Sequence, residues 1–123
     1  MNNRILVVDD EEEIAKLLEE FLNKKGYLIT TALSGQEAIE AIKKQECIDL
    51  MILDLKMPTV NGLDVLQELR RLNKQIPVII LSGSLDLQNF IDELKKLNYN
   101  EKDILYKPID LFELLKTIKN YLP

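Results

Sequence analysis

Hydrophobic residues along the chain gather in five short runs separated by longer amphipathic stretches. The runs cover residues 5–8, 27–32, 50–53, 78–81 and 104–106. Four of them are apolar at every position, which is typical of strands that are covered on both faces in a parallel sheet. The second run, YLITTA, contains two threonines and is predicted to be an edge strand.

Apolar residues between these runs recur at the spacing of amphipathic helices. Gly26 follows the first helical stripe and is predicted to end its helix. Ser34 and Glu37 form a capping box at the start of the second helix, and we expect Asp110 and Glu113 to cap the last one. The predicted stripes are Ile14, Leu17, Leu18, Phe21 and Leu22; Ala38, Ile39 and Ile42; Val65, Leu66, Leu69 and Leu72; Leu87, Phe90, Ile91, Leu94 and Leu97; and Leu111, Leu114, Leu115, Ile118 and Leu122.

Alternating strands and helices predict an α/β fold in which helices cover both faces of a parallel sheet. Right-handed crossovers favour a three-layer, doubly wound (βα)5 sandwich with the strand order 2-1-3-4-5. We expect residues 1–123 to form a single domain, because the chain contains no linker, repeat or low-complexity segment. In this strand order, a site is expected at the carboxyl ends of the first and third strands.

Composition and charge exclude several classes of function. The 123 residues are 46% hydrophobic and 30% charged, as in ordinary globular proteins, and the net charge of −5 without a basic stripe argues against direct nucleic-acid binding. The chain has no apolar stretch long enough to span a membrane, no secretory signal and only one cysteine, so we expect a cytoplasmic protein. Because histidine is absent, Ser-His and Cys-His catalysis and a phosphohistidine on the chain itself are excluded.

Acidic, hydroxyl and amine side chains, the types that bind metals and take part in reactions, lie at the carboxyl ends of the predicted strands. Asp9 and Asp10 follow the first run, and Asp54 follows the third. Ser82 and Lys107 follow the fourth and fifth runs. Because the carboxyl ends of parallel strands meet at one edge of a sheet, we expect these five side chains to converge.

The expected cluster of carboxylates predicts a cation site. Close carboxylates raise one another's pKa unless a cation lies among them. Oxygen ligands without histidine or thiolate favour a hard ion, and a few carboxylates with room for phosphate oxygens favour Mg²⁺ over Ca²⁺. Lys107 can neutralise a phosphoryl group, so an aspartate between Mg²⁺ and this lysine can become an acyl phosphate. Helix capping or a dipole interaction is the alternative for these acids, and it is the reading we favour for Glu11, Glu12 and Glu13.

Four segments together resemble the receiver domain of bacterial two-component response regulators, which has a flavodoxin-like fold. They are VVDD, LDLKMPTVNG, LSGS and YKP, and the resemblance covers essentially the whole chain. Its most specific part is the element formed by Asp54, Met57, Pro58 and Gly62. Lys56 and the closing NYLP are similar to single-domain regulators of the sporulation-phosphorelay or chemotaxis type.

The resemblance implies a role for each of these positions. Asp54 would accept a phosphoryl group from a phosphohistidine on a partner histidine kinase or histidine phosphotransferase. Mg²⁺ would be bound by Asp10 directly, by Asp9 largely through water, and by Asp54 and the backbone carbonyl of Lys56. Lys107 would pair with the phosphoryl oxygens, held by a cis peptide to the following proline. The domain would then signal to a separate effector protein rather than act as an enzyme.

The resemblance also implies a switch, and here the sequence departs from the family. Ser82 would be the switch hydroxyl that hydrogen-bonds a phosphoryl oxygen. Family members usually have Tyr or Phe three residues before the lysine, whereas this chain has Ile104, with Tyr106 on the same strand face by alternation. The Gly-Ala that usually precedes the last strand in the family is absent. The interval from Ser82 to Lys107 is a few residues longer than the resemblance leads us to expect. Lys56 and Ser84 occupy the positions that, in the family, tune the lifetime of the aspartyl phosphate.

Other classes of protein fit the sequence less well. A phosphatase of the haloacid-dehalogenase type needs a second aspartate two positions after Asp54, where this chain has Lys56. A flavodoxin-like cofactor binder needs a phosphate loop after the first strand, where the acidic DDEEE would repel the phosphate. The main alternative is a degenerate receiver that binds a partner without being phosphorylated. A complete single-domain regulator and a receiver cut from a longer regulator both fit this sequence.

Overall fold

The computed structural model describes residues 3–44, 47–83 and 87–123, and it places five strands in one parallel sheet. The strand order β2-β1-β3-β4-β5 confirms the predicted topology, with β2 at one edge. The strands are β1 (Arg4–Val8), β2 (Leu28–Ala32), β3 (Leu50–Asp54), β4 (Val78–Ser82) and β5 (Ile104–Tyr106).

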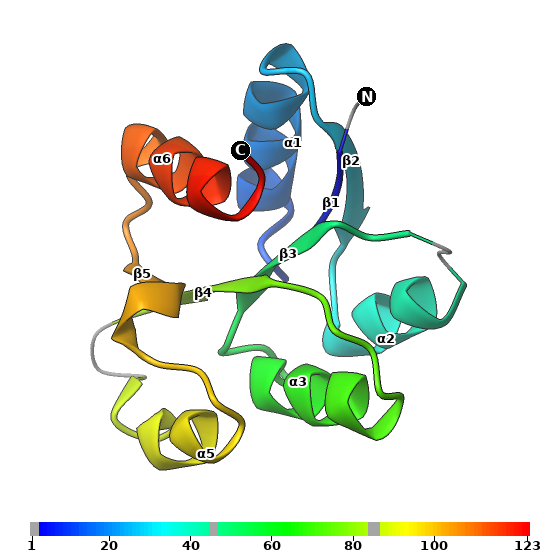
Figure 1. Cartoon of the computed structure of the whole chain (residues 1–123), viewed down its shortest axis with the longest axis vertical. Coiled ribbons are helices and arrows are strands. Elements are labelled where there is room, and N and C mark those ends of the chain that lie inside the picture. The colour runs from blue at the N-terminus through cyan, green and yellow to red at the C-terminus, as the bar shows by residue number, and fades with distance from the viewer. Residues whose placement is uncertain (1–2, 45–46, 84–86) are drawn as a thin grey trace.

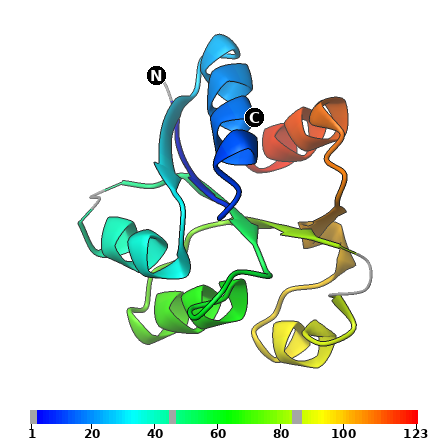
Figure 2. The same ribbon diagram turned by 180° about the vertical axis from the view of Figure 1, so that it is seen from behind.

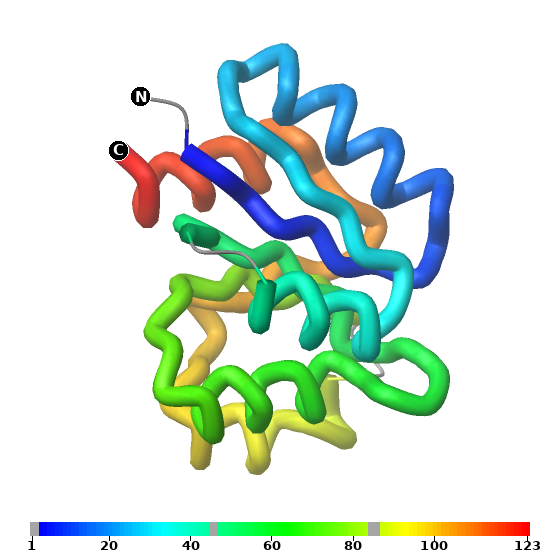
Figure 3. The backbone as a smooth tube through the Cα atoms, turned by 90° about the vertical axis from the view of Figure 1, so that its right-hand side faces the viewer, coloured from blue at the N-terminus to red at the C-terminus, as the bar shows by residue number. Residues whose placement is uncertain are grey.

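Helices cover both faces of this sheet, which confirms the three-layer sandwich. Figure 1 shows α1 and α6 on one side and α2, α3 and α5 on the other, and Figure 3 shows the same layers from the edge where β2 runs beside β1. The helices are α1 (Glu12–Lys24), α2 (Gly35–Lys44), α3 (Gly62–Arg71), α5 (Ile91–Lys96) and α6 (Leu111–Tyr121), with a 3-10 helix η1 (Glu101–Asp103) before β5. None of the helices in the described ranges is both long and apolar enough to cross a membrane.

Alternate residues of each strand pack into two separate cores, one on each side of the sheet. In β1, Ile5 and Val7 pack with Leu18 of α1 and Leu114 of α6. The residues between them pack against α2, α3 and α5. Because both faces of the central strands are buried, these strands are apolar up to their carboxyl ends, apart from the half-buried Arg4 at the start of β1.

Most of the predicted helix boundaries are present in the structure. Gly26, with a φ of 96°, follows the end of α1. The Ser34 hydroxyl accepts a hydrogen bond from the Glu37 amide at 3.0 Å, and the Glu37 carboxylate accepts from the Leu33 amide at 3.3 Å. The capping box therefore forms, but its return bond reaches one residue further back than predicted. Asp110 accepts hydrogen bonds from two amides of the first turn of α6.

Two details of the predicted helices are wrong. Leu17 belongs to the first predicted stripe, yet it is 51% exposed, and Ala15 is buried instead. Leu17 is rotated about 100° around the helix axis from the buried Leu18, which places it outside the face that packs on the sheet. The fourth predicted stripe runs from Leu87 to Leu97 in one helix, whereas residues 88–90 form a turn, in which the Phe90 amide donates to the Leu87 carbonyl, and α5 begins at Ile91.

The long segment before β5 forms a short helix that the sequence pattern did not predict. Asn100 caps η1 because its side chain accepts a hydrogen bond from the Lys102 amide, and the Asp103 carboxylate accepts one from the Asn100 amide. The part of the Ser82–Lys107 interval directly before β5 is therefore an ordered turn.

Candidate functional site

The ends of β1 and β3 bring the predicted acidic residues together. Val8 pairs with Leu53 in the sheet register, so the residues that follow them, Asp9 and Asp54, are neighbours. Carboxylate oxygens of Asp9, Asp10 and Asp54 lie within 4.8 Å of one another. Figure 2 shows the ends of these two strands side by side at the centre of the molecule. The predicted convergence of the three acids is therefore confirmed.

Asp54 is held in place by the close approach of α3 to the end of β3. The amide of Gly62, the first residue of α3, donates to the Leu55 carbonyl at 2.8 Å. A Cβ atom at Gly62 would lie 2.7 Å from both the Asp54 carbonyl oxygen and the Leu55 Cα, so only glycine fits there. The spacing between Asp54 and Gly62 in the sequence thus has a steric origin.

Lys107 supplies the positive charge between the buried acids. Its Nζ lies 3.2 Å from Asp54 Oδ2 and 3.3 Å from Asp9 Oδ2. It also lies 3.6 Å from the Glu11 carboxylate. The Lys107 amide donates to the Ser82 carbonyl at 3.0 Å, and the peptide to Pro108 is cis, as the resemblance implied. The backbone therefore fixes the lysine at the edge of the sheet, and its side chain reaches back over both aspartates.

Burial dominates the electrostatics of this cluster. It raises the pKa of Asp54 to about 6, with a further contribution from Asp9 and opposition from Lys107. Burial likewise raises the pKa of Asp9, against the Glu11 amide and Lys107. For Lys107, burial alone would lower the pKa, but Asp54 and Asp9 outweigh it and the pKa is raised. One ammonium thus leaves both buried carboxylates short of compensating charge.

The charge and chemistry of these residues fit a divalent cation. The three clustered aspartates carry three negative charges against the single positive charge of Lys107, which Glu11 also shares, so the site has an excess of negative charge. Asp9 and Asp54 are buried, whereas Asp10 is exposed, which leaves one side of the cluster open to a ligand. Carboxylate and carbonyl oxygens are the ligands that Mg²⁺ prefers.

A cleft of about 510 Å³ opens over Asp10 and Asp54. Asp10, Asp54 and Lys107 line it together with Lys56 and Gly83. The sequence patterns did not assign Glu11, Met57 or Pro58 to the wall of this cleft, although all three line it. Met57 and Pro58 belong to the family-like element after Asp54, which could have indicated their place in the wall. Nothing in the run of five acidic residues distinguishes Glu11 from its neighbours.

Glu11 differs from the two glutamates that follow it. Glu12 and Glu13 lie in the first turn of α1, where their negative charges interact favourably with the positive end of the helix dipole, as predicted. Glu11 is the N-cap residue, but its side chain makes no capping bond and faces Lys107 instead. The Asp9 carboxylate accepts the Glu11 amide at 2.9 Å, so Asp9 performs the local capping that was expected of the glutamates.

Ser82 lies beside the cluster without a hydrogen bond to it. The residue is buried at the end of β4, and its hydroxyl donates to the Gly83 carbonyl at 2.9 Å. Ile104 is buried in the core on the side of α2, α3 and α5, whereas Tyr106 pairs with Ser82 in register and is 47% exposed. The same-face prediction for Ile104 and Tyr106 agrees with this register. Ser84 lies outside the described residues.

Comparison with known proteins identifies the family to which this chain belongs. Residues 5–119 match the family described as the response regulator receiver domain. The chain therefore belongs to the receiver domain family of response regulators, which are signalling modules of two-component and phosphorelay systems. This family match agrees with the predicted fold and favours phosphorylation-dependent signalling over the degenerate alternative.

Two relatives with similar sequences belong to the same family of regulators. The chain is 36% identical over 125 residues to sporulation initiation phosphotransferase F of Bacillus subtilis, covering 100% of this chain and 96% of the relative. It is also 36% identical to response regulator SaeR of Staphylococcus aureus, but there it spans only 50% of the relative's length.

Solved receiver structures give the same result. The response regulator TrrA from Thermotoga maritima, solved in complex with Mg²⁺ and BeF, is 35% identical with a TM-score of 0.80, covering 97% of this chain and 98% of that one. The Francisella response regulator 1452 receiver domain is 33% identical with a TM-score of 0.82, covering 98% of this chain and 97% of that one.

Proposed function

We propose that the chain is a receiver in which Asp54 accepts a phosphoryl group from a phosphohistidine on a partner histidine kinase or histidine phosphotransferase. The observation that carries this proposal is the position of the Asp54 carboxylate. It lines an open cleft, 3.2 Å from Lys107 and within 4.8 Å of carboxylate oxygens of Asp9 and Asp10. We take residues 1–123 as one such domain, working in the cytoplasm.

The transfer needs Asp54 in its ionised form. One carboxylate oxygen of Asp54 attacks phosphorus, an O–P bond forms, and the N–P bond of the phosphohistidine breaks with its electrons returning to the imidazole. With a pKa of about 6, Asp54 is mostly ionised at neutral pH even without a cation. Burial weakens its solvation, so the carboxylate is not held by water when the phosphoryl group approaches.

The neighbouring residues bind the cation and offset the charge of the incoming group. Asp9, Asp10, Asp54 and the backbone carbonyl of Lys56 would hold Mg²⁺. When bound, Mg²⁺ would neutralise charge on the phosphoryl oxygens. The Lys107 ammonium, already shared by Asp9 and Asp54, would turn to a phosphoryl oxygen as charge accumulates on Asp54.

Ser82 would report the phosphorylated state to the surface. Its hydroxyl now donates to a backbone carbonyl, and exchanging that bond for one to the phosphoryl group would draw Ser82 and the end of β4 inward. The surface formed by α5 and β5 would repack and change its affinity for an effector protein. Lys56 is exposed at the mouth of the cleft, where we propose that it affects the access of water to the aspartyl phosphate.

The relatives support the proposed partners. The protein from Bacillus subtilis is named a phosphotransferase, and TrrA was solved with Mg²⁺ and BeF. We therefore expect a histidine-containing donor, a Mg²⁺ requirement and a separate or linked effector, with phosphoryl transfer to the chain itself rather than turnover of a substrate.

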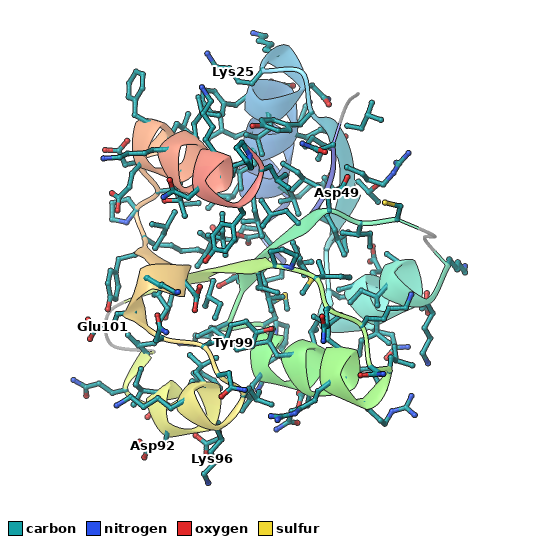
Figure 4. All side chains as sticks on the ribbon, viewed as in Figure 1. Lys25, Asp49, Asp92, Lys96, Tyr99 and Glu101 are labelled. Atoms are coloured by element: carbon teal, nitrogen blue, oxygen red, sulfur yellow. The ribbon has the colours of Figure 1, made fainter. Side chains whose placement is uncertain are left out.

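The test is incubation with Mg²⁺ and acetyl phosphate, followed by intact-mass measurement. We expect one phosphate adduct, its loss in Asp54→Asn, and its retention in Asp92→Asn, a matched change at an exposed acid on α5 (Figure 4). An adduct that survives Asp54→Asn contradicts the assignment of the acceptor. A folded protein that forms no adduct with either acetyl phosphate or a phosphorylated histidine phosphotransferase would be a degenerate receiver.

A further inference from the structure

A second pocket lies between α3 and the segment that runs from α5 to η1. Its volume is about 220 Å³, and none of its lining residues lines the cleft over Asp54. Leu66 and Leu69 of α3 and Leu97 after α5 contribute apolar walls. The volume is below the roughly 300 Å³ at which pockets for drug-sized ligands begin, so it suits a ligand with one small apolar group.

Three hydrogen-bond donors line the same pocket, while none of its described lining residues is acidic. They are the Arg70 guanidinium, the Lys74 ammonium and the Tyr99 hydroxyl, and the side-chain amides of Asn73 and Gln75 add further donors. This is unusual for a chain whose net charge is −5. Figure 4 shows Tyr99 between α5 and α3. Burial and Asp103 raise the pKa of Tyr99 while Arg70 opposes the rise, so the hydroxyl experiences the charge of the guanidinium.

The two cations keep donors beyond those used to hold the helices. Arg70 Nη1 donates to the Lys96 carbonyl at 3.1 Å, which ties α3 to the end of α5. Lys74 Nζ donates to the Ile42 carbonyl of α2 at 2.6 Å. A guanidinium carries five N–H donors and an ammonium carries three, so each retains capacity for a ligand.

We propose that this pocket binds a small organic anion, a carboxylate on a single ring or short alkyl body, with its charge on Arg70 and its apolar part on Leu66 and Leu69. The planar guanidinium matches a carboxylate, and the Tyr99 hydroxyl donates to the same oxygens. The occupant touches α3 and the segment after α5 together, so its binding stabilises the packing of these two elements.

The test is a titration of the full chain with benzoate, followed by ¹H–¹⁵N spectra, with benzamide as the uncharged counterpart. We expect shifts at residues 66–76 and 97–99, a Kd on the order of 1 mM, as for a ligand of this size, and a higher melting temperature. Benzamide should bind at least about 5-fold more weakly because it lacks the charge.

Matched variants separate recognition by the pocket from a general effect of charge. Arg70→Gln should weaken benzoate about 10-fold and Tyr99→Phe about 3-fold, as expected for a charged and a neutral donor. Arg71→Gln removes the same charge from the same turn of α3, but Arg71 pairs with Glu68 outside the pocket, so benzoate affinity should change less than about 2-fold. Equal losses in both arginine variants, equal binding of benzamide, shifts confined to the cleft around Lys107, or no shifts at 20-fold the expected Kd would each overturn the proposal. The phosphate adduct on Asp54 is scored separately, so either proposal can fail alone.

Discussion

Buried carboxylates at opposite ends of the sheet have very different surroundings. At the carboxyl end, Asp9 and Asp54 share the ammonium of Lys107, and burial raises the pKa of both acids. At the start of β5, Asp103 is only 8% exposed, but its two oxygens accept separate hydrogen bonds, one from the Tyr121 hydroxyl and one from the Asn100 amide at 3.0 Å.

The difference separates a carboxylate that supports the fold from carboxylates prepared for chemistry. Asp103 fastens the last turn of α6 to η1 with neutral donors that belong to it alone. Asp9 and Asp54 lie in a charge cluster that a cation or a phosphoryl group would rearrange, next to an open cleft. A buried acid with exclusive partners is a structural anchor, whereas buried acids that share one cation are sensitive to ligands.

Removing the shared cation should have the largest effect on stability. Lys107→Met leaves two buried carboxylates without a positive partner, and the free energy of unfolding at pH 7 in chelator should fall by about 3 kcal/mol. Urea denaturation followed by circular dichroism measures this loss. Lys116→Met, an exposed change on α6, is the control and should alter stability by less than about 0.5 kcal/mol. Equal losses in the two variants would mean that Lys107 does not hold the cluster together.

Removing the acceptor charge should have the opposite sign. The folded pKa of Asp54 is about 6 against an ordinary value of 3.8, so the folded protein binds the extra proton between these values. In chelator, the contribution of Asp54 to stability should therefore fall as the pH rises from about 4 to 7. Asp54→Asn should flatten this slope and raise the free energy of unfolding at pH 7 by about 2 kcal/mol, less than the full shift because Lys107 loses a partner.

Urea titrations at several pH values, with Asp92→Asn in parallel, measure the effect of Asp54. The control acid is exposed on α5, and its variant should keep the slope of the parent protein. If the stability of the parent protein relative to Asp54→Asn were to rise over this pH range, Asp54 would be stabilised in its ionised form, contrary to the burial argument.

The anchor at Asp103 should give the smallest change, and one that is independent of magnesium. Tyr121→Phe removes the hydroxyl that donates to Asp103 and should cost about 1 kcal/mol, the net contribution of one such hydrogen bond. Tyr106→Phe is the matched control because Tyr106 is 47% exposed, and it should be nearly neutral. If added Mg²⁺ were to abolish the loss in Tyr121→Phe, the two acidic regions would be coupled and the contrast between them would fail.

Much of the site could be predicted because it depends on chain order and strand ends. Asp9, Asp10 and Asp54 converge since parallel strands place their carboxyl ends at one edge, and no packing detail alters that result. Ser82 was correctly placed at the end of β4, yet its bond to the Gly83 carbonyl depends on a hydroxyl rotation that strand order does not specify.

The layers, the strand order and the set of charges at one sheet edge could be read from the residues alone, because they follow from local periodicity and the rules of parallel sheets. Tertiary structure alone decided that Glu11 faces Lys107, that Leu17 lies outside the core, and that Arg70 and Tyr99 meet across one pocket. These contacts depend on how each helix is rotated about its axis against the sheet and its neighbours. That rotation is set by the packing of whole helices, which no local pattern of residues encodes.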